Sequence, residues 1–142
     1  CRAAVYWARK GRCFVGYWVF MLVMVLLMPL VMLFTGRAFS KNAPKTINSV
    51  YGYRTVMSMK NQDTWQFAHR YFGRIWYRCG LVLTPATAAV MCLGLGKGEN
   101  TVSWLGSALC IVQLAVLCAA IVPTERALRR TFDADGKRRT TE

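Results

Sequence analysis

The residues best suited to chemistry gather in one polar stretch between two apolar runs of the chain. Residues 36–78 contain His69, which is the only histidine, and the charged residues Arg54 and Asp63. An arginine presents a planar fork of donors that suits a phosphate or a carboxylate, and a histidine can sense pH near neutrality. The simpler alternatives are that Arg54 anchors lipid headgroups and that His69 is a hydrogen-bonded structural residue.

Several residues of this stretch can also shape the chain itself. Gly52 supplies a position free of Cβ restrictions, which a tight turn or a close contact requires. The side chains of Asn48, Thr55 and Asn61 can satisfy backbone groups of the loop, which are costly to leave unpaired near a membrane.

Spacing gives no recognisable catalytic or metal site. The six cysteines lack metal-ligand spacing, and no Ser/His/Asp or Cys/His grouping is evident. The segment 133–136 has the first two acidic positions of a calcium loop, but basic residues then replace the further oxygen ligands that calcium needs. We therefore predict a non-catalytic protein without metal or cofactor. A lipid-modifying enzyme that uses His69, Asp63 and Arg54 is the open alternative.

Three uncharged apolar runs, 14–35, 79–96 and 101–122, can each cross a membrane as a helix. At about 1.5 Å per residue the longer runs reach about 33 Å, against a hydrocarbon core of about 30 Å. The chain is 55% hydrophobic with a net charge of +13, which excludes a typical soluble enzyme. We predict an all-α membrane protein with three transmembrane helices. A basic segment (1–13) precedes the membrane domain (14–122), and a polar tail (123–142) follows it.

The first run follows a basic segment, as the apolar core of a signal peptide would. It is too long for one, and residues 36–40 make a poor cleavage site, so we expect a retained helix. The chain starts at Cys1 rather than at methionine, and we expect its N-terminus to be truncated.

Small residues at four-residue spacing predict close helix packing along the second run. This row consists of Gly80, Thr84, Ala88, Cys92 and Gly96. The third run follows after a short polar turn, so the two form a helical hairpin. Its most polar residue, Gln113, is expected to make a hydrogen bond between helices rather than to bind a substrate.

The distribution of lysine and arginine predicts the orientation. With three spans, the N-terminal segment and the 97–100 turn share one side and hold five basic residues, whereas the 36–78 loop and the tail hold fourteen. Because basic loops stay in the cytoplasm, we expect the long loop and the C-terminus there.

The second half of the long loop has the pattern of an amphipathic helix, over residues 62–78. Apolar residues recur at helical spacing, opposite a basic row of Arg70, Arg74 and Arg78, and Asn61 or Asp63 can cap the start. We predict that this helix lies in the membrane interface, with the arginines on anionic headgroups. The alternative is that it docks on the membrane bundle and continues into the second span.

The loop also carries the residues of a known family. Asn48-Ser-Val-Tyr-Gly-Tyr-Arg-Thr55, the later Asn61, and the Trp65-x-x-x-His69-x-x-x-Gly73 spacing together resemble the SdpI/YfhL family of bacterial membrane proteins. The segment from Ile121 to Gly136 is similar to that family's continuation after its last helix, so the resemblance spans about residues 14–136. By this resemblance the signature positions are Asn48, Gly52, Arg54, Thr55, Asn61, Trp65, His69 and Gly73.

The resemblance implies a multi-pass protein of the bacterial inner membrane. The best-known role in the family is immunity to a secreted, membrane-active toxic peptide, which can be joined to signalling by holding a transcriptional regulator at the membrane. The partners implied are a toxic peptide, a cytoplasmic regulator and anionic lipid, with a homo-oligomer as a further candidate and no direct contact with nucleic acid. A small oligomeric transporter or channel module is the competing function.

Overall fold

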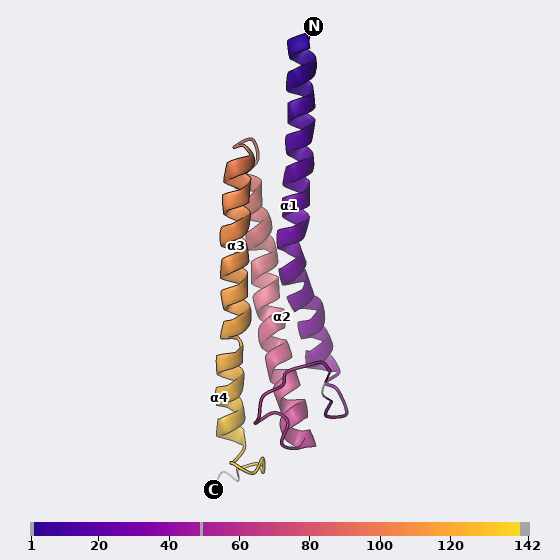
Figure 1. Ribbon diagram of the computed structural model, residues 1–142. Helices are drawn as coiled ribbons and strands as arrows, with labels where there is room; N and C mark the ends of the chain where they lie inside the picture. The colour runs from indigo at the N-terminus through magenta and orange to yellow at the C-terminus, as the bar shows by residue number, and fades with distance from the viewer. Residues whose placement is uncertain (1, 49, 140–142) are drawn as a thin grey trace.

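The structure is a computed structural model that describes residues 2–48 and 50–139, and only the backbone of residues 2–10 and 12. Four helices follow one another: α1 (Arg2–Lys41), α2 (Gln62–Leu93), α3 (Glu99–Ala119) and α4 (Ile121–Thr131) (Figure 1). Apart from an isolated antiparallel bridge between Phe132 and Arg138, the regular structure in these ranges is helical. The ends of the expected N-terminal segment and tail, Cys1 and residues 140–142, lie outside the described residues.

Three helical stretches of the described chain are long and apolar enough to cross a membrane. They are Cys13–Lys41, Gln62–Leu93 and Glu99–Thr131. Their outward faces are apolar, since Phe34 is 72% exposed and Ile111 is 69% exposed. Such surfaces suit acyl chains rather than water. The prediction of an all-α protein with three helices able to span a membrane is therefore confirmed.

Helix α2 joins the expected amphipathic segment and the second apolar run into one element. It runs from its cap at Asn61 to Leu93 without a break near residue 78. The side chains of Ala68 and Phe72 are buried in a core that also contains Leu128 of α4. The segment 62–78 is thus helical as expected, but it docks on the bundle and continues into the second run. Protein covers the part of its apolar face that Ala68 and Phe72 form.

Helices α1 and α2 pack with their backbones in close contact, because glycines lie where they meet. A Cβ atom on Gly73 would lie 2.7 Å from the backbone nitrogen of Ser40, and one on Gly80 would lie 3.0 Å from that of Leu33. These distances leave no room for a side chain. Since α2 also packs against α3 and α4, it is the central helix of the bundle.

The third membrane run continues into the segment that the sequence indicated as a polar tail. Helix α3 ends at Ala119 and α4 begins at Ile121. Pro123 accounts for the interruption, because proline has no N–H to donate to the carbonyl group four residues earlier. Beyond it, Leu128 and Phe132 are fully buried and hold this part of the tail against the bundle.

Different segments of the chain lie at the two ends of the bundle (Figure 1). At one end lie the C-terminal segment and the connector, which we define as residues 42–61 without Ser49. At the other end lie the N-terminus of α1 and the turn between α2 and α3. We call them the connector end and the turn end.

Candidate functional site

The connector is fastened to α2 through the ring of His69. The ring is fully buried, and its Nε2 accepts a hydrogen bond from the backbone N–H of Tyr53 at 2.9 Å. Its Nδ1 lies 2.8 Å from the carbonyl oxygen of Trp65. A carbonyl can only accept, so Nδ1 carries the proton and the imidazole is neutral in this arrangement. Of the two readings offered by the sequence, the geometry matches the hydrogen-bonded structural residue.

Gly52 allows the connector to approach this ring. Its φ angle is +107°, a region that residues with a Cβ atom rarely adopt, and a Cβ atom here would collide with Nε2 of His69. The rings of Phe39 and Trp65 pack on the imidazole, with centroids 5.2 Å and 4.2 Å away. The glycine, the tryptophan and the histidine of the family motif therefore form one contact.

Asn61 ends the connector and begins α2. Its side chain accepts a hydrogen bond from the N–H of Thr64 at 2.8 Å, and the Thr64 hydroxyl accepts one from the N–H of Asn61 at 3.1 Å. This reciprocal cap satisfies two backbone donors at the helix start. The Asn61 amide also donates to the carbonyl of Gly136 at 2.6 Å, which ties the C-terminal segment to the same point.

Other motif residues satisfy the backbone of the connector. Asn48 Oδ1 accepts hydrogen bonds from the N–H groups of Val50 and Tyr51 at 3.1 and 3.0 Å. The Thr55 hydroxyl donates to the carboxylate of Glu125 on α4 at 3.1 Å. The Trp65 indole donates to the carbonyl of Pro44 at 3.1 Å. An irregular segment beside a membrane needs such partners, because unpaired polar groups are costly there.

Tyr53 fills the space between the connector and the helices. Its side chain is buried against Phe72, with ring centroids 4.8 Å apart. Burial, with a smaller contribution from the nearby Glu125 carboxylate, raises the pKa of Tyr53 to about 12. The phenol therefore stays protonated under physiological conditions.

Arg54 differs from the other motif residues because its side chain is exposed. It lies at an apolar groove of about 430 Å³, whose lining includes Phe39, Trp76 and Leu117. The ion pairs within the described residues, Glu125–Arg129 and Asp63–Arg138, do not include it. Its guanidinium group can therefore meet a partner from outside.

Comparison with known proteins places the chain in a family. The model of the SdpI/YfhL protein family matches residues 45–124. The chain is also 39% identical over 94 residues to a protein of Bacillus subtilis (strain 168) described as uncharacterized protein YfhL, which covers 66% of this chain and 72% of that protein. The chain belongs to the SdpI/YfhL family. No solved structure matches it.

All eight signature positions expected from the resemblance lie within the region that the SdpI/YfhL family model matches. The structure brings Gly52, Trp65 and His69 into one contact, while Asn61 caps α2 and Gly73 packs on α1. Asn48 and Thr55 act at separate points of the connector. The pairing of Thr55 with Glu125 and with Ser58 was not predicted from the sequence, and neither partner is among the eight signature positions.

The basic row of α2 faces outward. Arg70, Arg74 and Arg78 are exposed. The first two line a hollow of about 170 Å³ beside the ion pair of Asp63 and Arg138, whose Nε and Oδ2 atoms lie 2.7 Å apart. Their contact with anionic headgroups stays a prediction for this SdpI/YfhL member.

The small-residue row of α2 divides into two parts. Gly80 is buried against α1, and the hydroxyl of Thr84 donates to the Gly80 carbonyl at 2.7 Å. Ala88 is half-buried, whereas Cys92 and Gly96 are exposed. Gly96 lies in the turn after α2 with a φ angle of +79° and open space around it. The structure therefore places the contact with α1 at the connector half of the row.

Gln113 lies inside the bundle. Its side chain is 1% exposed and donates to the hydroxyl of Thr87 on α2 at 2.9 Å, while its Oε1 has no partner among the described residues. This is a hydrogen bond between helices, as the sequence analysis expected.

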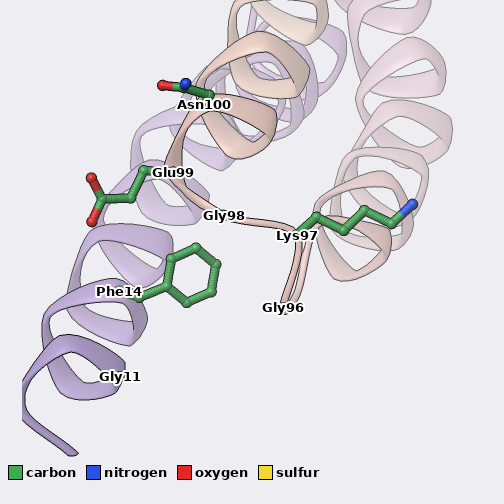
Figure 2. A pocket seen from close by; sticks show the side chains of 7 residues that line it. All are labelled: Gly11, Phe14, Gly96, Lys97, Gly98, Glu99 and Asn100. Atoms are coloured by element: carbon green, nitrogen blue, oxygen red, sulfur yellow. The ribbon is translucent and has the colours of Figure 1, made fainter. Parts of the chain in front are cut away.

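A larger hollow of about 610 Å³ lies at the turn end, between α1 and the 96–100 turn (Figure 2). The ring of Phe14 points toward the turn, whereas the side chain of Lys97 extends away from that ring. Three of its seven lining residues are glycines. Across the described residues, no group of three or more His, Cys, Asp or Glu side chains could hold a metal ion. The polar residues that line the hollow, Lys97, Glu99 and Asn100, are all exposed, and none of them is one of the eight signature positions.

Proposed function

We propose that this protein acts without catalysis and protects its membrane from a membrane-active toxic peptide. One observation supports this proposal above the others. The signature residues fold the connector onto the helix ends and leave Arg54 exposed beside an apolar groove. The signature thus shapes a surface at the membrane boundary, with the buried imidazole engaged in structural hydrogen bonds.

Signal coupling at the connector end is the second part of the proposal. Helix α4 exposes Arg126, Arg129 and Arg130, and Arg129 lines a hollow together with Val56 and Met57 of the connector. With fourteen basic residues in the 36–78 loop and the tail against five on the other side, we place this end in the cytoplasm. An acidic surface of a regulator protein can dock there. A fluorescent reporter that matures only in the cytoplasm, fused to the C-terminus, checks the orientation, and a dark but expressed fusion contradicts it.

The test of protection is survival of a toxin-sensitive bacterium that expresses the chain. We expect survival to rise with the natural protein and to fall sharply with Arg54→Ala, because the exposed guanidinium is lost. Arg78→Ala is the matched control, since it removes the same charge from an exposed position of α2 outside the groove. Membrane levels of the three proteins are compared by immunoblot. Full protection by the Arg54→Ala protein at equal levels contradicts the role of Arg54.

A small oligomeric transporter is the competing function, and the buried pair of Gln113 and Thr87 is the observation that favours it. Solute flux into reconstituted vesicles separates the two proposals. Protection without flux supports immunity. Flux that Gln113→Leu abolishes supports transport, because the leucine keeps the volume and removes the polar group.

A further inference from the structure

The apolar groove at the connector end crosses the level at which the membrane runs end. Its lining includes Thr35, the last residue of the first uncharged run, and Ile121, next to the last residue of the third. Trp76 lies just before the second run. The groove therefore spans the boundary at which lipid headgroups meet acyl chains, a level that tryptophan side chains prefer.

The groove has the size and lining of a binding site. Its volume of about 430 Å³ lies within the range of sites for small molecules. Aromatic and aliphatic side chains of Phe72, Trp76 and Leu117 form its walls. Ile121 is 44% exposed and the adjacent Val122 is 49% exposed, so the groove is continuous with the outward apolar surface of the bundle. An acyl chain can enter it sideways from the membrane.

The groove carries a positive charge, the guanidinium group of Arg54, that an external anion can reach. Arg54 lines it, is exposed, and takes part in neither ion pair of the described residues. The nearest acid on α4, Glu125, already accepts a hydrogen bond from Thr55 and pairs with Arg129. A guanidinium group binds a phosphate through two parallel hydrogen bonds.

We propose that the groove binds one anionic phospholipid of the surrounding leaflet. Its phosphate contacts Arg54, and part of one acyl chain lies along Trp76, Leu117 and Ile121. A lipid with a net negative charge is favoured over a zwitterionic one, because the zwitterion carries its own positive charge near the guanidinium. This inference does not depend on the proposed protection from a toxic peptide, since it concerns the resting protein in its membrane.

Native mass spectrometry of the full chain from detergent micelles tests the charge requirement. Phosphatidylglycerol and phosphatidylcholine with identical acyl chains are titrated separately. We expect the natural protein to retain one phosphatidylglycerol per chain in preference to phosphatidylcholine. Arg54→Gln should weaken that binding by about tenfold or more, as the loss of a charge-assisted hydrogen bond implies. Arg37→Gln is the matched control, because Arg37 is exposed on α1 near the connector end and does not line the groove. This protein should bind nearly as the natural protein does. Equal losses in both variants indicate general headgroup attraction and overturn the proposal.

A second pair of variants tests the groove itself. Leu117→Trp fills the space beside Trp76, and we expect it to abolish retention of the lipid. Leu114→Trp is the matched control, because Leu114 lies on the same helix, is 53% exposed and does not line the groove. Gel filtration and circular dichroism check that both variants fold. Unchanged lipid retention by the Leu117→Trp protein overturns the proposal. If the Leu117→Trp protein changes its oligomeric state but retains the lipid as before, the groove binds a second copy of the chain, and the proposal is also overturned.

Discussion

The helices of this bundle are connected in different ways at its two ends. At the turn end, residues 94–98 link α2 to α3 with exposed glycines at positive φ, and a Cβ atom on Gly96 or Gly98 would meet nothing. At the connector end, a segment four times as long is held by buried hydrogen bonds that Tyr53 makes with the side chains of His69 and Ser58. A short turn leaves its backbone to water, whereas a long irregular segment packed on helices needs a partner for each buried polar group.

The largest contrast is expected between glycine substitutions at the two ends. Gly52→Ala introduces a Cβ atom at positive φ against the His69 ring, and we expect it to lower the free energy of unfolding by about 2 to 4 kcal/mol. Gly96→Ala also introduces a Cβ atom at positive φ but meets open space, so we expect a loss of about 1 kcal/mol. Unfolding in mixed detergent and SDS micelles measures both. Similar losses at the two positions contradict the contrast.

A smaller loss of stability is expected when His69, which binds the connector to α2, is replaced. His69→Leu keeps much of the buried volume but leaves the N–H of Tyr53 without its acceptor, which should cost about 1 to 3 kcal/mol. Hydrogen exchange read by mass spectrometry should show faster exchange in the connector peptides, while peptides of the 94–98 turn exchange as before. Faster exchange at both ends alike indicates loss of the whole fold rather than release of the connector.

The smallest effect is expected when the pH is lowered, and it should be confined to the C-terminal segment around Asp133. Backbone N–H groups of Lys137 and Asp135 donate to the Asp133 carboxylate and hold its pKa below the usual 3.8, with the Lys137 contact the larger cause. A lowered carboxyl pKa stabilises the folded segment above the unfolded value, and this stabilisation is lost as the pH falls through the folded pKa. The amide resonances of residues 135 and 137, followed by NMR in micelles, should shift below about pH 4. The Asp133→Asn protein, which cannot titrate there, should not show the shift.

Part of the connector end was predictable from the sequence because it depends on neighbours along the chain. The position of Asn61 before an amphipathic pattern indicated a helix cap, and the cap is present. The expectation that Asn48 and Thr55 serve loop backbone groups also agrees with their hydrogen bonds. The sequence could not decide whether the 62–78 helix lies in the membrane interface or docks on the bundle. Hydropathy shows that one face of the helix is apolar, but lipid and protein are both apolar and either can cover such a face.

By itself, the sequence determined three helices that can cross a membrane, a short turn between the last two, and the placement of the long loop and the tail at the same end of the bundle. These properties follow from runs of apolar residues and from the alternation of sides, which are local along the chain. Only the tertiary structure decided that Thr55 meets Glu125, that His69 holds Tyr53, and that Gly73 lies against α1. The first of these pairs is separated by 70 residues. Such partners depend on how the helices pack, because a buried polar group is satisfied by whatever donor or acceptor the packed neighbour brings within reach.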